Sequence, residues 1–186
     1  MLLVAAGVAI GASWAPNPAH AEPERLAGVG VTSGARVYSN PLELQTEATV
    51  GVRVSMWLSD QLTVIVDGAH ANPTRRTSGA SSSFGDVRIL AAYHPWRSRW
   101  SPYFVTGVGG QFFNFHDAPG TAGAVVAAGT GIEFAASRRW ALFAEATANF
   151  YRAQYHVYTE FGTALKSSAA ATYATGALSL GAQVRF

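Results

Sequence analysis

Cysteine is absent from this 186-residue sequence. Its absence excludes disulfide bonds, cysteine-ligated zinc, a thiol nucleophile and the lipid-modified cysteine of a lipoprotein. Charge is also scarce, because Asp, Glu, Lys and Arg make up 13% of the residues, about half their share in typical soluble proteins. The formal net charge of +2 is too small and too scattered to indicate a nucleic-acid partner.

Long apolar runs are missing as well, once the N-terminal segment is set aside. No later stretch reaches the roughly 18 consecutive apolar residues of a membrane-spanning helix, although hydrophobic residues make up 49% of the sequence. A β-barrel reconciles these facts, because its apolar residues occupy every second position of each strand. The 19 glycines and 12% aromatic residues fit a curved sheet, but a soluble β-sandwich shares such figures.

Residues 1–21 are interpreted as a secretory signal peptide, which leaves 22–186 as a single β-barrel domain. An apolar segment over 2–14 is followed by two prolines and by Ala19-His20-Ala21, an A-x-A cleavage site. The positive residue that normally precedes such a segment is missing. The true start therefore lies upstream or the segment is unusual, and the alternative is a buried N-terminal helix.

The last residues of the chain alternate between apolar and polar. Leu178, Leu180, Ala182, Val184 and Phe186 share one parity, and Ser179, Gln183 and Arg185 share the other. This is the period of a strand with one apolar and one polar face. Upstream segments repeat it, and eight strands are predicted at roughly 25–34, 47–58, 62–71, 84–94, 102–113, 124–136, 140–152 and 171–186.

Connections of two lengths join these strands. Short turns at 59–61, 95–101 and 137–139 alternate with longer loops near 35–46, 72–83, 114–123 and 153–170. Short turns at one end and long loops at the other are typical of an outer-membrane barrel. The sequence therefore predicts an all-β fold, an eight-stranded antiparallel transmembrane up-and-down β-barrel with both termini on the short-turn side.

Almost all charged residues of the strands fall on one parity, which is predicted to face the lumen. This lumen charge network comprises Arg53, Asp67, Asp86, Arg88, Glu133, Glu145 and Arg185. An eight-stranded barrel is just wide enough for side chains to fill it, and buried charges of mixed sign should pair. A plugged polar lumen is therefore expected, with a narrow conduit, a small-solute porin, as the alternative. The faces of the glycine-rich fifth strand stay open.

If the charged parity faced outward instead, the chain would be a soluble lipocalin-like barrel or sandwich. Against this stand the aromatic residues at the ends of the apolar bands, since aromatics gather at membrane interfaces. The predicted aromatic girdle comprises Trp57, Trp96, Trp100, Tyr103, Trp140, Tyr151, Tyr155 and Phe186.

The two faces should also differ in their tolerance of charge. The polar lumen is expected to accept an arginine at Thr63 or Thr147 better than the lipid face accepts one at Val64 or Leu142.

Three stretches carry a family resemblance: Pro102-Tyr103 with the glycines that follow it, Gly129-Thr130-Gly131-Ile132-Glu133, and the turn that leads into Trp140. Together they resemble the small eight-stranded outer-membrane β-barrel family of the OmpA/OmpX type. The resemblance implies a monomer in a bacterial outer membrane that contacts outer-membrane lipids and lipopolysaccharide. It also implies that Phe186 is an assembly signal, read by the barrel-assembly machinery through the C-terminal strand. It is nearly silent on function, so the expected role is a scaffold that displays surface loops.

No catalytic, metal or cofactor site is predicted. Lipid A deacylases of the barrel type share a His-x-Ser motif. None of the histidines after the signal segment is part of such a motif; these are His70, His94, His116 and His156. A Ser-His-Asp site assembled across strands stays open. Arg75-Arg76 suits lipopolysaccharide phosphate, with a solvated loop as the alternative. The tyrosine-rich 153–170 loop could bind a partner or extend the girdle.

Overall fold

The computed structural model describes residues 27–39, 44–76, 79–116, 120–158 and 164–186; it leaves aside the side chains of Phe115, 153–158 and 164–171. The interpreted signal peptide at 1–21 lies outside these ranges and stays a prediction. Within them, no helix is long and apolar enough to cross a membrane.

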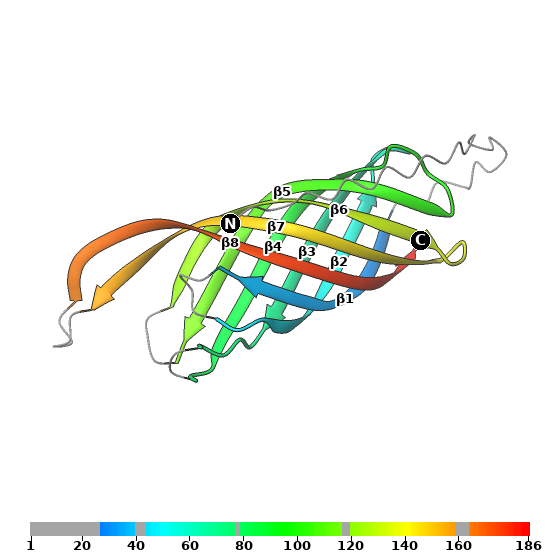
Figure 1. The fold of residues 1–186 in the computed structure, drawn as a ribbon. Helices are drawn as coiled ribbons and strands as arrows, with labels where there is room; N and C mark the ends of the chain where they lie inside the picture. The colour runs from blue at the N-terminus through cyan, green and yellow to red at the C-terminus, as the bar shows by residue number, and fades with distance from the viewer. Residues whose placement is uncertain (1–26, 40–43, 77–78, 117–119, 159–163) are drawn as a thin grey trace, which may run out of the picture.

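Eight antiparallel strands form a closed barrel in which each strand pairs with its neighbours in sequence (Figure 1). The ring closes where β1 pairs with β8, from Gly28↔Arg185 to Tyr38↔Thr175. This confirms the predicted up-and-down barrel. The strands are β1 (Ala27–Tyr38), β2 (Glu47–Trp57), β3 (Leu62–Ala71), β4 (Ser82–Tyr93), β5 (Trp100–Phe115), β6 (Thr121–Ala135), β7 (Trp140–Tyr158) and β8 (Ala164–Arg185).

The two parities of each strand lie on opposite sides of the barrel wall. On β2, Val50, Val52 and Val54 are exposed outside, whereas Arg53 and Ser55 are buried inside. The open question of the fifth strand is also resolved, because its exposed residues are Phe104, Thr106, Val108 and Phe112, and its buried ones are Tyr103, Val105, Gln111 and Phe113. The predicted inward parity is therefore the buried one.

A serine side chain fixes the geometry of each short turn. The Ser59 hydroxyl accepts hydrogen bonds from the backbone N–H groups of Gln61 and Leu62, at 3.3 and 3.1 Å. Ser137 accepts in the same way from Arg139 and Trp140, at 3.2 and 3.1 Å. Such side-chain bonds to the backbone favour turns over continued strands. The third turn uses Ser98, which accepts from the N–H of Trp100 at 3.3 Å.

Several strands are longer than predicted, and β1, β7 and β8 extend furthest into predicted loops. β1 continues through residues 35–38, which the sequence assigned to a loop, and β7 and β8 run through most of the predicted 153–170 loop. Pairing of β7 with β8 continues to Tyr158↔Ala164, with an irregularity between His156 and Tyr158. Ladder hydrogen bonds sustain a strand even where the sequence alternates weakly. Figure 1 shows this β7–β8 hairpin projecting past the other strands.

Two lumen glycines admit aromatic rings. The Tyr103 ring lies over Gly131, its cross-strand partner, and the Phe143 ring lies over Gly181. A Cβ atom at either glycine would collide with the ring and with backbone oxygen. Glycine at these positions therefore lets large side chains lie flat against the inner wall.

Candidate functional site

A chain of ion pairs crosses the middle of the lumen. The Arg88 guanidinium donates two hydrogen bonds to Asp67, from Nε at 3.0 Å and from Nη2 at 2.9 Å. Asp67 also accepts from Arg53 at 3.2 Å, and the same Arg53 nitrogen donates to Glu145 at 3.0 Å. Tyr103 donates its hydroxyl to the other Glu145 oxygen at 2.9 Å. These groups are buried, so each charge is compensated where water is scarce.

A second group of polar contacts lies toward the short-turn end. The Arg185 guanidinium lies 2.5 Å from Glu133, which also accepts a hydrogen bond from the Gln183 amide. The Gln183 carbonyl oxygen in turn accepts from the Ser55 hydroxyl at 2.9 Å. Asp86 joins the first group, since its carboxylate lies 3.7 Å from Arg88 Nε. The structure therefore brings all seven residues of the predicted lumen charge network into ion pairs, divided between two groups.

Arg36 is a lumen residue that the sequence analysis missed, because it fell in the predicted 35–46 loop. Its Nη2 lies 2.6 Å from Asp86, and its guanidinium stacks over the Phe84 ring at 4.3 Å. With Arg36, four arginines match four carboxylates inside the barrel. The excess of acid among the predicted network was the available signal that one more cation had to face inward.

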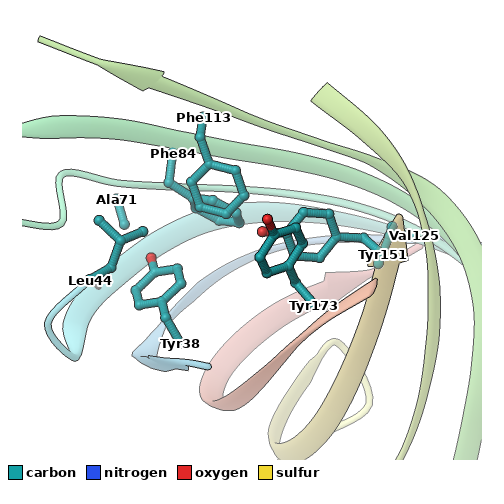
Figure 2. Close-up of a cluster of buried hydrophobic side chains, with 8 residues drawn as sticks. All are labelled: Tyr38, Leu44, Ala71, Phe84, Phe113, Val125, Tyr151 and Tyr173. Atoms are coloured by element: carbon teal, nitrogen blue, oxygen red, sulfur yellow. The ribbon is translucent and has the colours of Figure 1, made fainter. Parts of the chain in front are cut away.

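Aromatic side chains close the loop end of the lumen (Figure 2). Tyr38, Phe84 and Phe113 contact one another with ring centroids 5.0–6.1 Å apart. Phe113 stacks on Tyr151 at 5.7 Å, and Tyr151 stacks on Tyr173 at 5.2 Å. Leu44, from the connection between β1 and β2, is buried in the same cluster. We call this set the aromatic cap: Tyr38, Leu44, Ala71, Phe84, Phe113, Val125, Tyr151 and Tyr173.

A small cavity lies between the two polar groups, with Arg53, Glu133 and Gln183 among its lining residues. Its volume of about 20 Å³ has room for about one water molecule. A hydrated ion or small solute does not fit in this space.

His94 lies just past the end of β4, outside the strands, and packs against the Tyr103 ring at 5.2 Å. Burial, together with the positive charges of Arg97 and Arg185, lowers the pKa of the imidazole to about 4. His94 is therefore neutral at pH 7 and part of the packed short-turn end of the lumen.

The predicted aromatic girdle is wrong at three positions. Trp57, Tyr103 and Tyr151 are buried inside the barrel. The alternation of the strands could have revealed two of these inward positions. Trp57 lies on the same face of its strand as Arg53, and Tyr151 lies on the same face as Glu145. Trp96, Trp100, Trp140 and Phe186 are exposed on the outside, as the girdle requires. The Tyr155 side chain lies outside the described residues.

The histidines do not gather into a reactive site. His94 lies in the lumen end, whereas His70 and His116 are exposed. In the part of the chain that the structure describes, no three His, Cys, Asp or Glu residues are grouped so as to hold a metal ion.

No protein-family model matches the sequence, and no curated protein matches it. Solved structures do match. Neisserial surface protein A superposes with a TM-score of 0.67 at 15% identity, covering 86% of this chain and 97% of its own. The fold is that of the small eight-stranded outer-membrane barrels.

Two barrels from Pseudomonas aeruginosa extend this likeness. The outer membrane protein OprG has a TM-score of 0.55 at 11% identity and covers 87% of this chain and 96% of its own. The N-terminal β-barrel domain of OprF has a TM-score of 0.51 at 14% identity, with 86% and 97% covered. At identities this low, the likeness shows that this chain and these proteins share a fold, the outer-membrane-type barrel.

Proposed function

We propose that this chain is an integral outer-membrane β-barrel with a closed lumen that serves as a rigid scaffold for its long connections. The main support for this proposal is that the outer face of the barrel is apolar and the lumen face is polar, the reverse of a soluble protein. Large apolar side chains such as Val52, Ile89 and Leu180 are more than half exposed outside. Four arginines and four carboxylates of the strands pair inside, as a lipid environment requires. The likeness to outer-membrane barrels supports the choice of membrane.

Export through residues 1–21 and insertion by the barrel-assembly machinery belong to the same proposal. Membrane fractionation tests it, together with gel mobility before and after boiling. We expect the protein in the outer-membrane fraction, with a mobility shift on heating that marks a closed barrel. A protein that stays in the soluble fraction would favour a lipocalin-like fold.

The closed lumen is supported by three features in series: the aromatic cap, the ion-pair chain and the small cavity. Since an eight-stranded lumen is filled by side chains, we expect no stable ion conductance from the purified protein in planar bilayers. A large, steady conductance whose selectivity changes in Arg53 or Glu133 variants would establish a small-solute porin instead.

We assign the chain no reaction, since its described histidines lie apart and its lumen arginines hold carboxylates. We also propose that the long loops contact lipopolysaccharide. Arg76 is exposed, and its guanidinium suits the binding of lipopolysaccharide phosphate. Loss of lipopolysaccharide binding in Arg76→Gln would support this contact, and unchanged binding would leave Arg76 a solvated loop residue. We also propose a monomer, which light scattering in detergent tests.

A further inference from the structure

The short-turn end of the barrel carries four exposed arginines that the proposed function does not use. Arg97 and Arg99 lie in the turn between β4 and β5, and Arg138 and Arg139 in the turn between β6 and β7. Among the described residues, none of the four forms an ion pair with a carboxylate. Asp60 is the one acidic residue in the three short turns, so four positive charges stand against one negative charge.

The long connections at the other end have the opposite balance. Arg75 and Arg76 are their two basic residues, against Glu43, Asp117 and Glu160. The three short turns therefore carry a net positive charge that the long connections lack, and the small net charge of the whole chain conceals this difference.

Backbone hydrogen bonds hold the two arginine-bearing turns beside their neighbouring strands. The N–H of Ala135, at the end of β6, donates to the carbonyl of Arg99 at 2.9 Å. The N–H of Arg185 donates to the carbonyl of Arg139 at 2.8 Å. Ser98 and Ser137 fix the turns themselves. Arg99, Arg138 and Arg139 therefore stand on an ordered edge rather than on long loops. The Arg97 guanidinium turns to the lumen mouth instead, where it donates to the Thr63 hydroxyl at 3.1 Å and lies over the Trp57 ring.

Exposed tryptophans border the same turns. Trp96 and Trp100 flank Arg97 and Arg99, and Trp140 follows Arg139. Tryptophan rings favour the headgroup level of a bilayer. Arginines next to them reach the phosphates, which a guanidinium binds with two parallel hydrogen bonds.

We propose that this arginine–tryptophan rim, made of Trp96, Arg99, Trp100, Arg138, Arg139 and Trp140, binds the phosphates of anionic phospholipids. The inference rests on the proposed function, which places the short turns at the periplasmic leaflet. That leaflet is built of phospholipids, so a lipid such as phosphatidylglycerol fits both the position and the charge of the rim.

Quenching of tryptophan fluorescence by brominated lipids tests the rim directly, because the tryptophans of the rim report which lipid lies beside them. The full chain carrying Trp14→Phe is reconstituted in phosphatidylcholine vesicles that contain brominated phosphatidylglycerol or brominated phosphatidylcholine. We expect phosphatidylglycerol to be preferred by about fivefold or more, since each arginine near an anionic surface contributes severalfold. High salt should reduce the preference.

Two variants locate the interaction. Arg138→Gln/Arg139→Gln should lose much of the preference, and adding Arg99→Gln should bring it to about one. The control Arg152→Gln removes an exposed charge from the loop end of β7 and should keep the preference. The heat-dependent gel shift verifies that each variant has folded.

If the inserted barrel is quenched equally by both lipids, or if the variant lacking Arg99, Arg138 and Arg139 keeps the preference, this inference alone is overturned. A wild-type chain that inserts into no vesicle overturns the proposed function, and this inference with it.

Discussion

The inner and outer faces of β7 contain different kinds of side chain although they belong to one backbone. Inside, Glu145 and Asn149 are almost fully buried and bonded to Arg53 and Arg88. Outside, Leu142 and Phe150 are about half exposed. In a soluble barrel the charged face would meet water. Here charge is buried with its partners and the apolar face is left for lipid, so the two faces should respond to substitution through different physics.

The largest expected effect lies on the inner face. Glu145→Gln leaves the Arg53 guanidinium with less compensation and should destabilise the barrel by about 3–5 kcal/mol. Urea unfolding in lipid vesicles, followed by circular dichroism, measures this loss.

The double variant Arg53→Met/Glu145→Leu is the control, because replacing a buried pair with apolar residues is often nearly neutral. If the double variant is as unstable as the sum of its single variants, the ion pair is not the source of the effect.

The next effect lies on the outer face. Ile89→Arg, in the middle of β4, should cost about 2–4 kcal/mol, because arginine is costly at the bilayer midplane. Tyr93→Arg, on the same face at the end of the strand, should cost about 0–1 kcal/mol, since the penalty falls near the interface. The same urea titration applies, and equal costs at both depths would argue against a membrane-spanning β4.

His94 offers a pH-dependent comparison between the packed lumen end and the unfolded chain. Its pKa of about 4 in the barrel lies below the ordinary value near 6.5, so the unfolded state binds the proton more tightly. The stability associated with neutral His94 is therefore complete above pH 6.5 and declines as the pH falls toward 4. About 2 kcal/mol should be lost between pH 7 and pH 4.5.

His94→Gln should remove this part of the pH dependence, which urea titrations of both proteins at a series of pH values would reveal. Parallel pH profiles for the variant and the wild type would show that another group titrates there.

The smallest effect on stability is expected at Phe186. Its side chain is 67% exposed, while its backbone exchanges two hydrogen bonds with Ala27 that a substitution leaves in place. Phe186→Ala should therefore cost about 1 kcal/mol or less in vesicles, yet lower the amount of protein in the outer membrane if Phe186 is an assembly signal. Cell fractionation measures that amount, and a wild-type level would remove the assembly role.

The structure revises one expectation about the inner face. An arginine at Thr147 or Thr63 was expected to be tolerated in a polar lumen. Both threonines are buried, and Thr147 accepts a hydrogen bond from Arg88 at 3.4 Å. An added arginine would meet a like charge in a filled space, so the lumen should reject it as well.

The sequence by itself determined that there are eight strands and which face of most of them is apolar, because alternation is a local property with a period of two residues. It placed β3 at 62–71 as observed, and it assigned Arg53, Arg88 and Glu145 to the parity that is buried. Serine and polar residues also marked the short turns. These features depend on near neighbours in the chain, so no tertiary information was needed to predict them.

Only the tertiary structure decided which groups meet inside. Arg36 and Asp86 are 50 positions apart in the chain, and Arg53 and Glu145 are 92 apart. Their contacts depend on barrel closure and on the register of every strand between them, which alternation does not specify. The same reason explains the aromatic cap, since Tyr38, Phe113 and Tyr173 come from three distant strands and meet only when the ring is closed.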